Sequence, residues 1–217
     1  MTEAHMLLSV DFDAYPNGSA PPDDWWVEGG ERVWVDDGHL RVKADPPGAR
    51  DPGYVCTVWH NTPVDGDLHV AFDAHVIDSS CDANNINFFL LYADPAGTPL
   101  HETRGDRADG AYGHYHGLNG MIVTFLNDTD SGSGKARFRM RRCPGFRLVD
   151  ENYDYHCRTG VTYHVELTRL GGEVACAVDG TTYLRWTDPD PLARGLIGFR
   201  TYRTDLWWDH LRVTRPG

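Results

Sequence analysis

The chain has 217 residues, of which 41% are hydrophobic and 24% are charged, and its formal net charge is -12. This length and apolar content are typical of a folded globular protein with a substantial core. The negative charge argues against binding to nucleic acid or to an anionic membrane, so an anionic ligand requires a local patch of positive charge.

Short segments rich in β-branched and aromatic residues recur along the chain, and turn signals separate them. The sequence has no convincing amphipathic helix pattern, which favours a β-sandwich or jelly roll. We expect one all-β domain over residues 1–217, with two antiparallel sheets. In chain order, the expected strands are 6–12, 25–27, 31–35, 39–43, 54–60, 68–77, 85–92, 119–127, 137–142, 147–153, 161–169, 173–178, 182–186, 195–202 and 206–213.

Tight turns are expected where glycine follows aspartate or another glycine. These pairs are Asp37-Gly38, Gly171-Gly172 and Asp179-Gly180. Glycine and aspartate tolerate the left-handed backbone conformation that two-residue hairpin turns require. The pattern therefore predicts hairpins at these positions.

The longest stretch without periodicity runs from residue 99 to residue 118. Long loops of this kind inside compact domains are usually binding loops or lids. Its end contains His114, Tyr115 and His116, and such side chains can transfer protons near neutral pH. We therefore predict that these residues are catalytic.

A basic run follows, in which Arg137, Arg139 and Arg141 alternate with Phe138 and Met140. In a strand, this alternation places the arginines on one face and the apolar residues on the other. Aligned guanidinium groups repel each other unless an anionic or hydrogen-bonding group lies between them. The arginines are predicted to bind substrate, although a solvated face paired with Asp and Glu is an alternative.

Polar residues elsewhere supply further candidates for substrate binding. Asn85 and Asn87 share one face of their expected strand, Asn119 follows the histidine loop, and Glu151 is the best acidic partner for an arginine or a sugar hydroxyl. Candidate sugar-stacking aromatics are Trp59, Tyr112 and Tyr115, whereas Trp25, Trp34, Trp186 and Trp207 are expected to pack in the interior.

The five cysteines form no Cys-x-x-Cys pair. This count excludes a complete disulfide framework and makes a zinc ribbon improbable, so buried free thiols are expected. The first twelve residues lack the features of a secretion signal, and no stretch has the apolar length of a membrane span. The expected location is the cytoplasm.

No metal or other cofactor is expected, although a structural calcium ion is left open. His114 and His116 form a His-x-His pair, which in a strand places both rings on one side. The carboxylate that usually follows such a pair is missing here. A metal site would therefore require His156 to complete it.

Several segments resemble those of two known families. Gly195–Arg200 and Leu206–Val213 look like the last strands of concanavalin-A-like jelly rolls. The segments Tyr-His-Gly-Leu-Asn-Gly (115–120), Ala-Arg-Phe-Arg-Met-Arg-Arg-Cys-Pro-Gly-Phe (136–146) and Leu-Val-Asp-Glu (148–151) resemble the YesU-like family of uncharacterised bacterial jelly rolls. This resemblance implies a carbohydrate ligand in the concave face, but the family has no settled reaction.

The chemistry of these residues favours cleavage of a small oligosaccharide or glycoside, including one that contains a uronate. Paired glutamates on one strand, as retaining glucanases use, are absent from the sequence. Arginine can neutralise a uronate carboxylate while His or Tyr removes the neighbouring proton. Lyase and hydrolase activities stay open, and a non-catalytic lectin-like module is the alternative. The oligomeric state is not predicted.

Overall fold

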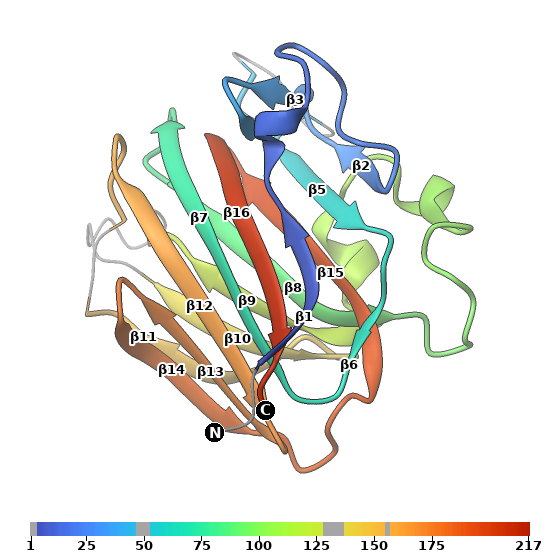
Figure 1. Ribbon diagram of the computed structural model, residues 1–217. Helices are drawn as coiled ribbons and strands as arrows, with labels where there is room; N and C mark the ends of the chain where they lie inside the picture. Colours follow the sequence, from blue (N-terminus) through green and yellow to red (C-terminus); the bar gives the residue numbers. More distant parts are fainter. Residues whose placement is uncertain (1–3, 47–52, 128–136, 155–156) are drawn as a thin grey trace.

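The computed structural model describes residues 4–46, 53–127, 137–154 and 157–217. They form two antiparallel sheets that face each other, as the sequence predicts (Figure 1). The first sheet contains β1 (His5–Val10), β3 (Arg32–Asp36), β4 (His39–Lys43), β7 (Leu68–Asp78), β12 (Thr162–Leu170), β13 (Glu173–Val178), β14 (Thr181–Thr187) and β16 (Asp205–Arg215). The second sheet contains β2 (Trp25–Gly29), β5 (Val55–His60), β6 (Val64–Asp65), β8 (Ile86–Ala93), β9 (Asn119–Phe125), β10 (Phe138–Cys143), β11 (Arg147–Asn152) and β15 (Arg194–Tyr202).

The strand order is β14-β13-β12-β7-β16-β4-β3 in the first sheet, where β1 also pairs with β16. In the second sheet it is β11-β10-β9-β8-β15-β5-β2, and β6 also pairs with β15. The first and last strands of the chain therefore lie side by side, as Figure 1 shows for β1 and β16. Among the described residues, no helix is long and apolar enough to cross a membrane.

The predicted hairpin turns are confirmed. Asp37 and Gly38 join β3 to β4 with φ angles of 51° and 76°, and Asp179 and Gly180 join β13 to β14 with 50° and 76°. Gly171, between β12 and β13, also has a positive φ of 64°. These residues supply the left-handed conformation that matches the twist of the flanking strands.

The main core lies between the two sheets. Along β4 and β12, buried and more exposed residues alternate, because alternate side chains point toward the core and toward solvent. Phe72 of the first sheet packs against Phe88 and Phe199 of the second, with ring centroids 5.2 and 5.0 Å apart. Phe138 and Met140 also point into this core, as their alternation with arginine predicts.

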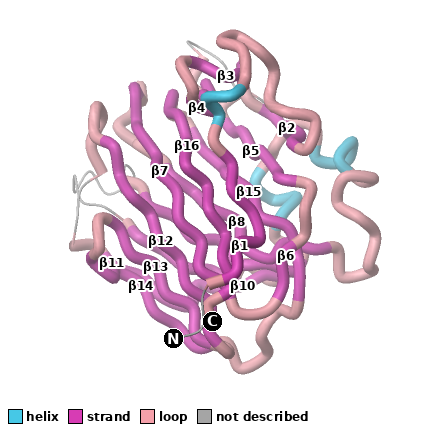
Figure 2. Tube along the Cα trace, in the orientation of Figure 1, coloured by secondary structure: helices cyan, strands magenta, loops and turns pink. Residues whose placement is uncertain are grey.

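The central strands of the second sheet are buried on both faces. All residues of β5 are buried, and in β8 and β15 the exceptions lie at the ends. The outer face of this sheet is covered by residues 94–118, which we call the covering segment. Its short helical turns, η2 (Arg104–Arg107) and η3 (Tyr112–Tyr115), lie beside the second sheet (Figure 2). A smaller apolar cluster fills the space beneath the segment.

Several local features differ from the sequence prediction. The opening strand ends at Val10, and Phe12–Ala14 forms the 3-10 helix η1 with the side chain of Asp11 as its N-cap. The short strand β6 was not expected, since two residues carry no periodicity. Cys56, Cys143, Cys157 and Cys176 are free and buried, as predicted, whereas Cys81 is partly exposed.

Candidate functional site

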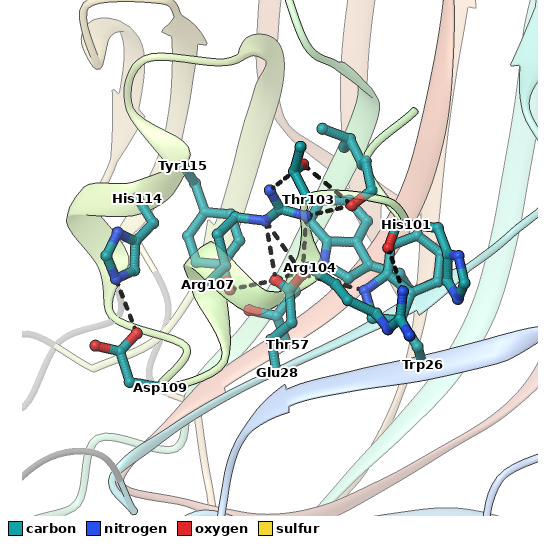
Figure 3. Close-up of polar contacts among 12 residues, drawn as sticks. Trp26, Glu28, Thr57, His101, Thr103, Arg104, Arg107, Asp109, His114 and Tyr115 are labelled. Carbon is teal, nitrogen blue, oxygen red and sulfur yellow. Dashed lines mark hydrogen bonds and ion pairs between the residues drawn. The ribbon is translucent and has the colours of Figure 1, made fainter. Parts of the chain in front are cut away.

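A buried carboxylate fixes the covering segment to the second sheet. Glu28, which is 1% exposed, accepts hydrogen bonds from Trp26 Nε1 at 3.1 Å and from Trp59 Nε1 at 3.0 Å. From the covering segment, the hydroxyl of Tyr115 donates a hydrogen bond to the Glu28 carboxylate at 2.7 Å, and Arg107 forms an ion pair with it at 3.0 Å. Figure 3 shows Trp26, Arg107 and Tyr115 converging on Glu28. A buried charge is tolerated when it is paired and hydrogen-bonded in this way.

Glu28 is one end of a polar row that crosses the second sheet. Residues directly opposite each other on neighbouring strands point to the same face. Here that face is the outer one, because Val58, Phe88 and Phe199, which alternate with members of the row, lie in the main core. From β11 to β2 the row contains Glu151, Arg139, Thr124, Asn87, Arg200, Thr57 and Glu28.

The covering segment leaves part of this row open. The open part forms a cavity of about 420 Å³, which we call the Arg139 cavity. This volume is within the usual range for small-molecule sites. Its lining includes Asn85, Asn87, Thr124, Arg139, Arg141, Arg200, Tyr112, Phe146 and Tyr202.

Among the described residues, no acidic side chain forms an ion pair with Arg139 or Arg141, and together with Arg200 these arginines line one cavity. Arg141 donates to the carbonyl of Phe146 at 3.1 Å, and its guanidinium lies 4.1 Å from the centre of the Phe146 ring. Arg139 makes no hydrogen bond or ion pair within the described chain. Burial and the charges of Arg137 and Arg141 lower the pKa of Arg139. The carboxylate of Glu151, opposite Arg139 on β11, attracts this charge without forming an ion pair, so the lining of the cavity keeps an excess of positive charge.

Arg200 links the cavity to the covering segment. It is 1% exposed and donates to Thr57 Oγ1 at 2.7 Å and to the carbonyl of Gly110 at 2.8 Å. Its guanidinium also lies 4.6 Å from the ring centre of Tyr112 and 5.0 Å from that of Tyr115. These contacts hold a third positive charge at the back of the cavity.

The two asparagines of β8 line the same cavity. Asn87 Nδ2 donates to Asn85 Oδ1 at 3.1 Å. The Oδ1 atom of Asn87 is buried and has no hydrogen-bond partner within the described residues. A buried acceptor without a partner is costly, so a ligand that donates a hydrogen bond to it gains affinity.

The predicted catalytic residues occupy three different environments. Tyr115 is fully buried, and its hydroxyl donates a hydrogen bond to Glu28. It therefore does not face the cavity, although we predicted a catalytic role for it. His114 Nε2 lies 2.8 Å from Asp109 Oδ1, and Figure 3 shows this pair apart from Glu28. His116 stacks on Phe146 at 3.7 Å and contacts the edge of Tyr112 at 4.8 Å, so it adjoins two residues that line the cavity.

Burial and the charges of Arg200 and Arg141 lower the pKa of His116 below its usual value. The Nε2 atom of its ring is buried and has no hydrogen-bond partner within the described residues. Burial raises the pKa of Tyr112, although Arg200, Arg139 and Arg141 oppose that shift. At neutral pH, the imidazole of His116 is therefore neutral and the hydroxyl of Tyr112 is protonated.

The remaining predicted binding residues, Arg137, Glu151 and Asn119, do not line the cavity. Arg137 donates to Glu151 Oε1 at 2.9 Å. Burial raises the pKa of Glu151, but the hydrogen bond from Arg137 and the charges of Arg137 and Arg139 lower it overall. Asn119 begins β9 opposite Ala93. Trp59 is 0% exposed and donates to Glu28, so it is not the sugar-stacking surface that we predicted.

Sequence reasoning missed Arg200, Phe146 and Tyr202. Arg200 follows a buried apolar run in β15, and a charged residue in such a strand is unusual enough to be a signal. Tyr202 is 41% exposed at the mouth of the cavity, where an aromatic ring can contact a ligand. Phe146 has a positive φ of 53° in the turn after β10, a conformation that the sequence does not reveal.

The described residues contain no group of three or more His, Cys, Asp or Glu side chains placed to hold a metal ion. His156, which the alternative metal site requires, lies outside the described residues. That the protein has no cofactor stays a prediction, and so does the possibility of a structural calcium ion.

Comparison with known protein families gives one match. Residues 51–212 match the model of a domain of unknown function, DUF6250, which covers most of the chain. The chain belongs to this family. No curated protein matches the sequence of this DUF6250 member. Membership establishes an uncharacterised family, and the YesU-like resemblance stays a prediction.

Similar solved structures support the jelly-roll fold of this DUF6250 protein. A protein of unknown function with a galectin-like fold from Bacillus subtilis has a TM-score of 0.73 and 18% identity, with 98% of each chain covered. The carbohydrate-binding module CBM66 from Bacillus subtilis has a TM-score of 0.59 and 10% identity, covering 91% of this chain and 99% of that chain. A prokaryotic β-1,3-1,4-glucanase from a mouse hindgut metagenome also has a TM-score of 0.59, with 12% identity and coverage of 97% and 99%.

Glu28→Gln tests the anchor of the covering segment. Removing one charge of a buried pair leaves Arg107 uncompensated, so the free energy of unfolding should fall by about 3 to 5 kcal/mol. Urea denaturation measures this change, and amide hydrogen exchange should become faster in residues 100–115. Glu31→Gln is the matched control, since Glu31 pairs with Lys43 at the surface and its loss should cost under about 1 kcal/mol. Equal effects of the two substitutions would contradict the anchoring role.

Proposed function

We propose that the Arg139 cavity binds an acidic oligosaccharide or glycoside, and that the protein cleaves this ligand by elimination next to its carboxylate. The observation that carries the proposal is the pair of guanidinium groups without acidic partners. In a chain with 32 acidic residues, such groups are readily neutralised by the protein itself. Arg41, Arg107, Arg137 and Arg142 pair with acidic side chains, whereas Arg139, Arg141 and Arg200 lie together at one cavity without such a partner among the described residues.

A saccharide is supported by the remaining lining of the cavity. Asn85, Asn87 and Thr124 supply amide and hydroxyl groups, which can both donate and accept hydrogen bonds as sugar hydroxyls do. Tyr202 and Phe146 supply aromatic surface at the same cavity. Some proteins of similar fold bind or cleave carbohydrate according to their names, which include a carbohydrate-binding module and a glucanase.

The elimination requires a cation, a base and an acid. Guanidinium groups beside the carboxylate stabilise the negative charge that develops when the neighbouring carbon loses its proton. The electron pair of that C–H bond forms a carbon–carbon double bond, and the bond from the next carbon to the glycosidic oxygen breaks. The departing oxygen then takes a proton from an acid. Arg139 and Arg141 are suited to the first role.

His116 and Tyr112 are suited to the two proton transfers. The lowered pKa of His116 favours its neutral imidazole, which is the form that accepts a proton. The raised pKa of Tyr112 keeps its hydroxyl protonated, so it can donate to the leaving oxygen. Tyr112 thus takes the tyrosine role that the sequence assigned to Tyr115. Their mutual contact, at 4.8 Å between ring centroids, places both groups beside the cavity.

Arg139→Gln tests the binding of the acidic group. The loss of charge-assisted hydrogen bonds, about 1.5 to 3 kcal/mol, should weaken binding of a uronate oligosaccharide at least about tenfold. Isothermal titration calorimetry measures the affinity. Arg32→Gln is the control, because Arg32 lies over Trp34 on the first sheet and should bind like the wild type. Unchanged affinity in Arg139→Gln would refute the assigned ligand.

His116→Ala tests elimination. The wild type should produce a new ultraviolet absorbance from the carbon–carbon double bond when it acts on uronate oligosaccharides. We expect a loss of about 100-fold or more in His116→Ala, whereas Trp186→Phe on β14 of the first sheet, which does not line the cavity, should keep the activity. Saccharide binding without any absorbance change in the wild type would instead favour a lectin-like module.

The pH dependence tests the role of His116 as the base. Its folded-state pKa lies below the usual value of 6.5, so the active neutral form persists as the pH falls through 6.5. The value of kcat/KM, which reports groups of the free enzyme, should therefore begin to decline only at pH values below 6.5, and below the lowered pKa it should fall about tenfold per pH unit. In Arg141→Gln, one cause of the shift is gone, so the inflection should move to higher pH. An inflection that does not move would exclude this assignment.

A further inference from the structure

A second cavity, of about 430 Å³, lies at the opposite ends of β8 and β15 from the Arg139 cavity. We call it the Arg194 cavity. It is lined by Tyr92 and Leu196, whereas Asn87 and Arg200 of the same strands line the Arg139 cavity. Tyr92 comes five positions after Asn87, which corresponds to roughly 16 Å along a strand. The two cavities share no lining residue.

The floor of the Arg194 cavity is apolar. Tyr92, Leu100 and Leu196 are at most 7% exposed and belong to the cluster beneath the covering segment. Pockets that bind small molecules commonly combine such a floor with a few polar groups that fix the orientation of the ligand. The C–H face of a sugar ring is a suitable partner for this surface.

The polar groups at the rim carry opposite charges. Arg194 and Asn61 make no side-chain hydrogen bond or ion pair to any residue that the structure describes. His101 contacts the edge of Trp26 at 5.3 Å, and Asp94 accepts one hydrogen bond, from the backbone N–H of Ala96 at 2.7 Å. The rim therefore offers an unpaired cation together with a carboxylate that keeps acceptor capacity.

This charge pattern distinguishes the second cavity from the first. The Arg139 cavity contains guanidinium groups and no acidic side chain in its described lining, which favours an anion. In the Arg194 cavity, Asp94 repels an anion and Arg194 repels a cation. A neutral ligand that both donates and accepts hydrogen bonds satisfies every rim group, and sugar hydroxyls do this.

We infer that the Arg194 cavity is a second saccharide site, which binds an uncharged sugar ring. The ring lies on Leu100 and Leu196, while its hydroxyls accept from Arg194 and donate to Asp94. The side chains of Asn61 and His101 can both donate hydrogen bonds to the sugar hydroxyls and accept hydrogen bonds from them. The inference uses no residue of the Arg139 cavity, so either site can fail its test without the other.

The test is a backbone amide NMR titration of the full chain with three probes, methyl β-glucoside, methyl β-galactoside and methyl α-mannoside. We expect at least one probe to cause saturable shifts in residues 92–101 and 194–196. Arg194→Ala and Asn61→Ala change exposed side chains at the rim, and each should weaken that probe about fivefold or more. Arg139→Gln should leave its affinity unchanged. Because the ligand is uncharged, added salt should have little effect.

Several outcomes would overturn the inference. These are the absence of saturable shifts with all three probes, shifts that map to the Arg139 cavity, or unchanged affinity in both Arg194→Ala and Asn61→Ala. Tighter binding of glucuronate than of the methyl glycosides at residues 92–101 would also overturn it, since the charge pattern predicts the reverse.

Discussion

The hydrogen bonds and the ion pair of the buried Glu28 carboxylate hold the covering segment against the second sheet. Four side chains donate to this carboxylate, and two of them, Arg107 and Tyr115, come from the covering segment. Without that segment, the outer face of the second sheet would expose Trp59 and its neighbours to water. An unpaired carboxylate in the same place would carry a large desolvation cost. The segment and the carboxylate therefore stabilise each other, and the position of the segment defines both cavities.

The polar row across the second sheet connects this anchor to the candidate site. At the β2 end, Glu28 and Thr57 are covered and engaged within the protein. Toward β10, Asn87, Thr124 and Arg139 line the open cavity. Arg200 lies between the two halves, since it bonds to the covering segment at Gly110 and lines the cavity as well. One row of residues thus serves as structural support at one end and supplies the groups that we propose to bind ligand at the other.

The sequence predicted the fold better than the site. Alternation placed Phe138 and Met140 in the core and Arg139 and Arg141 on the outer face, because strand periodicity is a local property. The partners of Glu28 could not be predicted, since Trp59, Arg107 and Tyr115 lie 31, 79 and 87 residues away. The histidine loop was recognised as unusual. However, its helical turn separates His114, Tyr115 and His116 into three environments, and no pattern in the sequence encodes their directions.

We propose that the guanidinium groups of Arg139 and Arg141 receive the acidic group of a saccharide. A crystal structure with a bound uronate disaccharide measures this most directly. We expect the carboxylate within hydrogen-bond distance of at least one of these guanidinium groups, with a hydroxyl of the sugar donating to Asn87 Oδ1. A disaccharide bound elsewhere, with both guanidinium groups facing water, would contradict the claim.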